Sequence, residues 1–469
     1  MVKPTAGYAA GREPLRAPRG TAISCKGWQQ EAALRMLMNS LDPEIAEAPE
    51  DTIIRSGAGG AAHDGKPLHA IVESLAGLEN DETLLVGSGE PEGVFCTHAD
   101  APRVLIMGSS AGSWTFAGIQ AYLQWAYEAM DGAARKYFQG SLAGKLVASA
   151  GMGARGGAHA LGATLQGAAF LGIDADSDRI KRRVKSGYCD VMVTDLDEAL
   201  RILKNAVRKR EAASVGLAGD CADVFPEMAS RGVVPDVMTD ETCAANPPTS
   251  CIVPELIVEA ETELPGGHRA RSLESRARQA EGMLALEKMG AVRLGFGSGL
   301  STLASGESGE GRAAVLWAAL SGEPADMRRA DDLLLEMFAD NELLCRWIRL
   351  SRKRVRFQGL PARVSWLDRG ERGRFALALN ELVAGGELKA PLAITRLHLD
   401  GGASTPSLPR QREFRDGLDA IADGSKEMAA RIERMLASDA GMGIVEYSGV
   451  SDPEAEGFAH ESGMNFSAS

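Results

Sequence analysis

Apolar and polar positions in the middle of the chain alternate in the manner of repeated βα units. Residues 145–150 form a short apolar run, typical of a buried parallel strand, and residues 157–169 are rich in Ala and Leu, which favours a helix. A second apolar run follows at residues 170–173. The alternation continues with a predicted helix at residues 222–232 and a predicted strand at residues 233–240. This order of elements predicts an α/β fold built on a parallel sheet.

The first predicted strand ends in a glycine-rich turn at residues 151–156 with the spacing G-x-G-x-x-G. In dinucleotide-binding folds these glycines allow a tight turn, close approach of the backbone to a pyrophosphate, and close packing of helix on strand. Asp174 ends the next strand, where an acid binds the ribose 2′-hydroxyl, and its carboxylate favours NAD over NADP. Arg179 weakens that preference only slightly. The order of these parts favours a dinucleotide site over a phosphate-free βαβ turn.

The segments before this region give less specific signals. An amphipathic pattern predicts a helix at residues 28–41, and a run from residue 113 to residue 130 predicts a second one. Residues 67–75 also favour a helix. Residues 56–60 form a glycine-rich turn, which is either a connecting loop or a second backbone surface for a phosphate.

Polar residues follow several predicted strands. Asp220, Cys221 and residues 241–246 come directly after two of them. Open α/β sheets bind ligands beyond the carboxyl ends of their strands, so these are candidate contacts, with ordinary βα loops as the alternative. At the end of the strand-like run PLAITRLHLDGG, His398 and Asp400 share one face, which suits proton transfer. A structural histidine is the alternative there.

Composition narrows the class of protein. A chain of 469 residues exceeds the ~250–300 residues of a single core, so we expect two domains. The net charge of −13 argues against nucleic acid or an anionic membrane as the main partner. No apolar run approaches the ~18 residues of a transmembrane helix, and the scattered set of 7 cysteines favours reduced thiols in a cytoplasm. The 7 histidines form no H-E-x-x-H motif, so no metal site is expected.

Motifs spread over most of the chain resemble those of urocanase (urocanate hydratase). Before the glycine turn they include LRMLMNSLDPEIAE, LENDETLLVGSGEPEGVF and SAGSWTFAGIQ. After it come RGVVPDVMTDETCAANP, WAALSGEP, RFQGLPARVSW and LALNELVAGGELKAPLAI. The chain is therefore identified as a divergent and shortened member of that family.

The resemblance implies a fold and an activity. The fold is a mixed α/β core domain with a Rossmann-type NAD domain inserted into it, and we expect core segments at residues 1–140 and 293–469 around an NAD-binding domain at residues 141–292. In that family NAD serves as an electrophile in the addition of water to urocanate, a step of histidine metabolism, and carries no hydride. The resemblance also implies a homodimer.

The resemblance further implies the cofactor contacts, and several of them depart from the family pattern. Asp174 replaces a Glu, Asp220 and Cys221 replace Asn-Ala, Glu241 replaces a Gln, and Phe296 replaces a Tyr. The complete set of implied NAD contacts is Gly57, Gln124, Gly151, Gly153, Ala154, Arg155, Gly156, Asp174, Arg179, Asp220, Cys221, Glu241, Thr242, Cys243, Ala244, Ala245 and Phe296.

Other departures concern the substrate. Arg55 stands where the family has a Tyr, Gly309 falls near the place of a reactive Cys, and Leu397 replaces an acid. Arg55 suggests an additional anionic or acceptor group in the ligand. The expected substrate is therefore a heteroaryl acrylate, either urocanate or a thio- or methylthio-urocanate.

If the protein is a hydratase, three residues are candidates for handling that substrate. Arg363 is the expected clamp for the propenoate carboxylate, because a guanidinium can hold a carboxylate in bidentate fashion. His398 would move a proton, and Asp400 would orient it or activate water. Two alternatives remain: a non-catalytic NAD-binding homologue and, less favoured, an NAD-dependent dehydrogenase.

Overall fold

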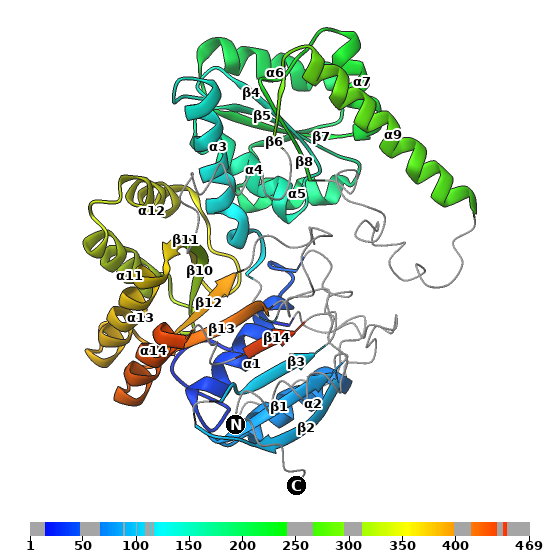
Figure 1. The fold of residues 1–469 in the computed structure, drawn as a ribbon. Coiled ribbons are helices and arrows are strands. Elements are labelled where there is room, and N and C mark those ends of the chain that lie inside the picture. The colour runs from blue at the N-terminus through cyan, green and yellow to red at the C-terminus, as the bar shows by residue number, and fades with distance from the viewer. Residues whose placement is uncertain are drawn as a thin grey trace.

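Two sheets organise the protein, which is a computed structural model (Figure 1). The structure describes residues 15–46, 66–87, 90–99, 101–107, 114, 117–241, 266–294, 312–397, 414–438 and 444–447.

Among the described residues, the smaller sheet has six strands, all of them parallel, in the order β6-β7-β5-β4-β8-β9. The strands are β4 Leu146–Ala150, β5 Ala169–Asp174, β6 Val191–Val193, β7 Ala213–Ala218, β8 Val237–Asp240 and β9 Val292–Leu294. The helices that follow them are α4 Ala154–Leu165, α5 Ser177–Ser186, α6 Leu196–Lys209, α7 Cys221–Ser230 and α9 Gly266–Lys288. The predicted α/β fold with a parallel sheet is confirmed.

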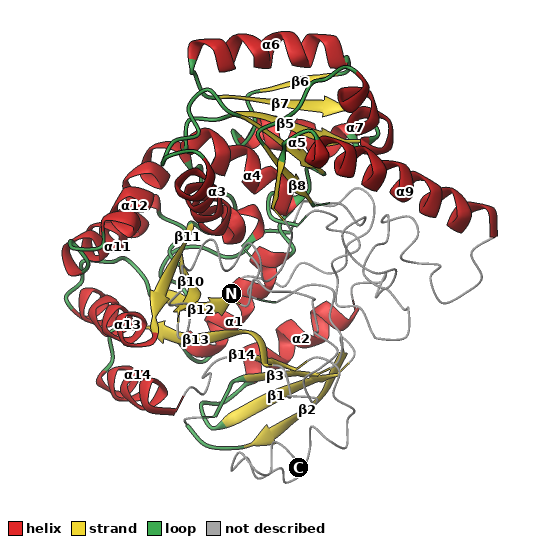
Figure 2. Cartoon of the chain, turned by 45° about the horizontal axis from the view of Figure 1, so that its top comes forward, coloured by secondary structure: helices red, strands yellow, loops and turns green. Residues whose placement is uncertain are grey.

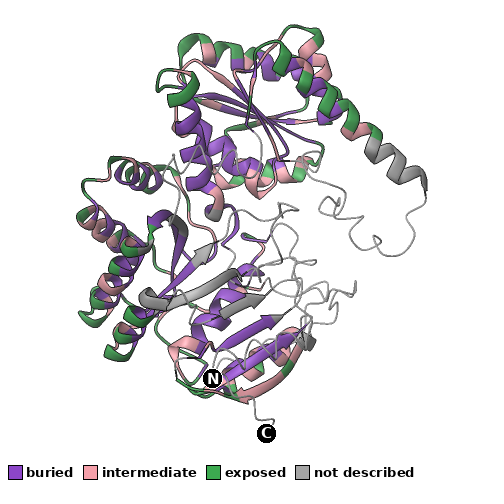
Figure 3. Cartoon of the chain, viewed as in Figure 1, coloured by how far each residue is buried: buried purple, intermediate pink, exposed green. Residues whose placement is uncertain are grey.

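The inner strands β4 and β5 are buried on both faces, which explains their continuous apolar runs (Figure 3). Val147 and Phe170 belong to the core that contains α4, while Ala148 and Leu171 belong to a second core beneath α6 and α7. Figure 2 shows helices on both sides of the strands. The sheet is therefore the central layer of a three-layer sandwich.

The order of the strands reverses between β4 and β8. After β4 the chain forms β5, β6 and β7 on one side of β4. It then crosses to the other side of β4 and forms β8 and β9 there. Open parallel sheets bind their ligands at such a switch point, beyond the carboxyl ends of the strands. The glycine turn after β4 and Glu241 after β8 both lie there.

The larger sheet is mixed and takes strands from both ends of the chain, in the order β11-β10-β12-β13-β14-β3-β1-β2. Only β1–β3 and β3–β14 are parallel among its described pairs. The strands are β1 Glu82–Gly87, β2 Glu90–Cys96, β3 Val104–Met107, β10 Arg312–Ala319, β11 Ala362–Asp368, β12 Leu392–Leu397, β13 Phe414–Ala422 and β14 Ile444–Tyr447. The six-stranded sheet is therefore an insertion between two halves of the larger one.

The helices predicted at residues 28–41 and 67–75 correspond to α1 and α2, and further helices lie around the larger sheet. Together they are α1 Trp28–Ser40, α2 Lys66–Gly77, η1 Gly118–Tyr122, α3 Leu123–Tyr137, α11 Pro324–Met337, α12 Glu342–Arg354, α13 Arg369–Ala384 and α14 Lys426–Ser438. The helix predicted at residues 113–130 is wrong at its start: Gly118 has φ +65°, and a short 3-10 helix precedes α3. α3 packs on α4 and so joins the two halves of the molecule (Figure 1).

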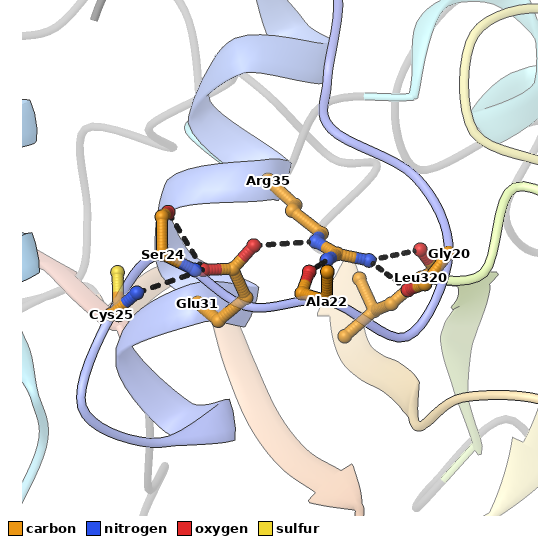
Figure 4. Close-up of polar contacts among 7 residues, drawn as sticks. All are labelled: Gly20, Ala22, Ser24, Cys25, Glu31, Arg35 and Leu320. Carbon is orange, nitrogen blue, oxygen red and sulfur yellow. Dashed lines mark hydrogen bonds and ion pairs between the residues drawn. The ribbon is translucent and has the colours of Figure 1, made fainter. Parts of the chain in front are cut away.

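Arg35, on α1, ties the start of the described chain to the larger sheet (Figure 4). Its guanidinium donates to Glu31 Oε1 at 2.8 Å and to the carbonyl oxygens of Gly20, Ala22 and Leu320. Burial disfavours the charged form of Glu31, but hydrogen bonds from Arg35 and Ser24 hold its pKa below the usual range. The charge pair is buried, so each partner depends on the other.

Candidate dinucleotide site

The turn between β4 and α4 requires glycine at two positions. Gly151 has φ +87°, and its N–H donates to Ile173 O at 2.7 Å. A Cβ added to Gly156 would lie 1.9 Å from Gly151 O, which would push the helix away from the strand. These two glycines are therefore needed for the turn itself.

Gly153 has a different environment. It precedes the first residue of α4, and a Cβ added there would meet no atom of the described chain within 4 Å. Its backbone is extended, with φ −60° and ψ −166°. The start of α4 is thus an open cradle with glycine at its rim, and helix N–H groups with a positive dipole end favour an anion there. The residues present fit the pyrophosphate of a dinucleotide.

Asp174 lies beside this cradle, as predicted for the acid at the end of the second strand. Its Oδ2 accepts a hydrogen bond from Met152 N at 2.7 Å, and its Oδ1 accepts one from Asp176 N at 2.9 Å. A carboxylate oxygen has two acceptor sites, so a ribose hydroxyl can still bind. Nη1 of Arg179 lies 3.8 Å from Asp174 Oδ2, and Nε of Arg179 lies 3.5 Å from Asp176 Oδ2. The two acids neutralise Arg179, which supports a ribose without a 2′-phosphate.

Two further predicted contacts follow β7. Asp220 caps α7, where its Oδ1 accepts from Ala222 N at 2.8 Å, and its Oδ2 lies 3.4 Å from Ser275 Oγ. Cys221 is buried, with Sγ 3.4 Å from Ile173 O, and burial raises the pKa of its thiol. Asp220 therefore lies at the ligand edge of the sheet, whereas the side chain of Cys221 is part of the packing beneath it.

Gln124 is the predicted contact on the aromatic helix. Its Nε2 donates to Glu128 Oε1 at 2.7 Å, and its Oε1 accepts from Trp366 N at 2.9 Å. The side chain is fully buried and links α3 to β11. In this geometry both polar ends of Gln124 bind protein, and a contact with NAD stays a prediction.

The side chain of Glu241, one of the predicted NAD contacts, is buried beneath the cradle against His159, a partner that the sequence did not predict, and its contact with NAD stays a prediction. Nε2 of His159 lies 3.2 Å from Glu241 Oε1, although neither atom has in-line hydrogen-bond geometry with a described residue. Nδ1 of His159 lies 3.0 Å from Thr239 Oγ1, and its ring stacks on Trp125 with centroids 5.4 Å apart. Burial is the largest cause of both pKa shifts: it lowers the pKa of His159 to about 3 and raises that of Glu241 well above its usual value. Two residues far apart in sequence give no periodic signal, so only the pairing of β4 with β8 brings them together.

Arg363 lies on β11 and is already paired. Its Nε and Nη2 donate to the two carboxylate oxygens of Asp331 at 3.1 and 2.8 Å, and both side chains are buried. The guanidinium also lies over the ring of Phe357, 5.2 Å from its centroid. Only Nη1 has no hydrogen-bond partner among the residues that the structure describes. The bidentate face that was expected to clamp a substrate carboxylate is therefore occupied by Asp331.

The remaining predicted site residues lie outside the described residues, and their roles stay predictions. They are Arg55, Gly57, Thr242, Cys243, Ala244, Ala245, Phe296, His398 and Asp400. Within the described ranges, no group of three or more His, Cys, Asp or Glu could hold a metal ion. None of the described helices combines the length and the hydropathy that a membrane-spanning segment requires.

The parallel sheet, its switch point and the glycine cradle define a Rossmann-like domain within a mixed α/β protein. Three family models match the chain in succession: the urocanase N-terminal domain at residues 15–126, the urocanase Rossmann-like domain at residues 118–315, and the urocanase C-terminal domain at residues 308–423. The chain belongs to the urocanase family.

Proposed function

We propose that the protein is a urocanase-type hydratase that holds NAD tightly and adds water to urocanate or to a thio- or methylthio-urocanate. The observation that carries this proposal is the open cradle at Gly153, located at the switch point of a chain with all three urocanase domains. The family suggests a hydro-lyase, and the Rossmann-like domain is consistent with a nucleotide cofactor.

We assign parts of the dinucleotide to residues that the structure describes. The N–H groups at the start of α4 would hold the pyrophosphate, and Asp174 would accept a ribose hydroxyl. When bound, NAD would supply an electrophilic nicotinamide ring. The residues that follow β4 and β8 would hold the nicotinamide half of the dinucleotide.

Fewer described residues support the proposed substrate contacts than support the dinucleotide site. Arg363 would meet a carboxylate through Nη1 alone, because Asp331 occupies Nε and Nη2. His398 and Asp400 come directly after β12, a strand paired with β10 and β13, and we assign them the proton transfers. We also propose that the protein forms homodimers.

Absorbance tests the reaction directly. Urocanate absorbs in the near ultraviolet, and hydration of its side chain removes that absorbance, so purified protein is mixed with urocanate and with each sulfur-substituted analogue. Loss of absorbance with one of them, and no formation of reduced nicotinamide, supports the proposal. Turnover of an analogue alone changes the substrate and keeps the reaction.

One observation favours a second candidate, a non-catalytic homologue that binds NAD. The predicted carboxylate clamp Arg363 is held by Asp331 and buried, as expected of a structural pair. Protein that contains NAD but leaves every analogue unchanged would support this candidate and reject the hydratase.

A further inference from the structure

The loop that follows β7 lies beside the acid that would bind a ribose. β7 pairs with β5 so that Ala218 is opposite Asp174, and the N–H of Gly219 donates to Asp174 O at 3.0 Å. Asp220 and Cys221 come directly after this contact. They therefore stand next to Asp174 at the carboxyl edge of the sheet.

The order of the strands assigns this place to a base of the dinucleotide. Along the edge the cradle follows β4, Asp174 ends β5, and Asp220 follows β7, the next strand outward. A nucleotide carries its base and its phosphate on opposite sides of the ribose. A dinucleotide with its pyrophosphate at the cradle and a ribose at Asp174 therefore extends the base of that half toward β7.

Arg179 provides a flat surface on the other side of this place. Its guanidinium is held by Asp174 and Asp176, at 3.8 and 3.5 Å, and the side chain is 35% exposed. A planar guanidinium stacks on aromatic rings. The base would thus lie between Arg179, in the first turn of α5, and the loop after β7.

The loop offers one hydrogen-bond acceptor and one donor to such a base. Asp220 is exposed, and its Oδ1 caps α7 by accepting from Ala222 N at 2.8 Å. Among the described residues, its Oδ2 accepts only from Ser275 Oγ, at 3.4 Å. The N–H of Cys221, the first residue of α7, donates to no atom of the described chain, as is usual in the first turn of a helix. An ionised carboxylate can only accept, so an acceptor and a donor stand on adjacent residues.

We propose that Asp220 and the N–H of Cys221 select adenine as the base of the bound dinucleotide and reject a base with a keto group in place of its amino group. This assignment rests on the proposed NAD site and names the base that the site prefers. Adenine carries an amino donor next to a ring nitrogen that accepts, which matches Asp220 Oδ2 and the N–H of Cys221. Hypoxanthine has the same shape with both polarities reversed, so its keto oxygen would face the carboxylate and its ring N–H would face the N–H of Cys221.

Asp220→Asn should remove the preference, because the cap determines which atom reaches the base. The one oxygen of Asn has to replace Oδ1 as the acceptor from Ala222 N, and Asn caps helices as well as Asp does. The amide NH2 then replaces Oδ2 and donates, which suits a keto oxygen and opposes an amino group. Asp368→Asn is the matched control: Asp368 caps α13, at the end of β11 in the larger sheet, by accepting from Glu371 N at 2.8 Å.

Calorimetry on full-length protein that has been freed of copurified dinucleotide tests this assignment. NAD is compared with nicotinamide hypoxanthine dinucleotide, which differs from it only in this base. The wild-type protein and Asp368→Asn should bind NAD about 10–100-fold more tightly than the analogue, because two hydrogen bonds, one of them to a charged group, become repulsive contacts. Asp220→Asn should bind the two dinucleotides within about threefold of each other, because each base then makes one favourable and one repulsive contact.

A second variant keeps the test decisive if Asp220→Asn does not fold. Asp220→Ser keeps a capping oxygen and lacks Oδ2, so it should prefer NAD less than the wild-type protein does. Equal affinity of the wild-type protein for both dinucleotides, or a full preference for NAD in the variants of Asp220, would overturn the inference and leave the NAD site standing. If the wild-type protein binds neither dinucleotide, both the inference and the NAD site fail.

Discussion

Replacement of Glu241 by Gln should change how stability depends on pH, independently of any ligand. Burial raises the pKa of Glu241 well above the ordinary value of 4.5. The folded protein therefore keeps a proton on this carboxyl at pH values where the unfolded chain has lost it. Stability falls with rising pH wherever the folded state binds more protons, so Glu241 removes stability from pH 4.5 up to its folded pKa.

The slope follows from the linkage relation. One proton corresponds to about 1.4 kcal/mol per pH unit, so Glu241 costs about 3 kcal/mol if the folded carboxyl keeps its proton over about two pH units. Solvent screening does not reduce this figure, because the side chain is 2% exposed. The difference in the free energy of unfolding between the wild-type protein and Glu241→Gln isolates this contribution from all other titrating groups.

Urea unfolding followed by tryptophan fluorescence measures this difference, with Glu198→Gln as the matched control, because Glu198 is exposed on α6 in the same domain. As the pH rises from 4.5, Glu241→Gln should gain stability relative to the wild-type protein until the pH passes the folded pKa of Glu241, and it should then hold a constant advantage. Glu198→Gln should remain parallel to the wild-type protein. Parallel profiles for Glu241→Gln as well would show that the buried carboxyl is already ionised, and would refute the reasoning.

Three further substitutions have defined outcomes. Arg35→Ala should lower the free energy of unfolding by about 3–5 kcal/mol, because it leaves Glu31 as an unpaired buried charge, and thermal melting measures the loss. Arg363→Lys should raise KM for the acrylate and also lower stability by about 1.5–3 kcal/mol, since Asp331 loses one charged hydrogen bond; a raised KM with unchanged stability would contradict the pairing. His398→Ala should lower turnover by about 10²–10⁴ while NAD stays bound, and full turnover on a confirmed substrate would make His398 structural.

The sequence was sufficient for those parts of the fold that depend on local periodicity. The apolar runs and the G-x-G-x-x-G turn predicted β4, α4 and β5, and they predicted that Asp174 lies next to the turn. In the structure, Met152 N donates a hydrogen bond to Asp174. The predicted start of the helix at residues 113–130 was wrong, because amphipathic periodicity does not reveal that Gly118 adopts a left-handed conformation.

Partners of buried polar residues could not be predicted in this way. Arg363 has the chemistry of a carboxylate clamp, but only the packing of α11 against β10, the strand next to β11, shows that Asp331 takes its bidentate face. His159 occupies an apolar helix pattern and gives no sign of the carboxyl it meets. Periodicity defines which face of an element is buried, and the choice of partner depends on strand order and helix packing.

NAD retained by the purified protein is the most direct test of the proposed site. Wild-type protein, Gly153→Val and Gly77→Val are denatured by heat, and the supernatants are assayed for NAD. A Cβ at either glycine meets no described atom within 4 Å, so both variants should fold, but only position 153 borders the cradle. We predict that the wild-type protein and Gly77→Val release NAD and that Gly153→Val releases none. A wild-type protein that releases no nucleotide and shows no thermal shift with added NAD, or a Gly153→Val variant that retains as much NAD as the wild-type protein, would contradict the account.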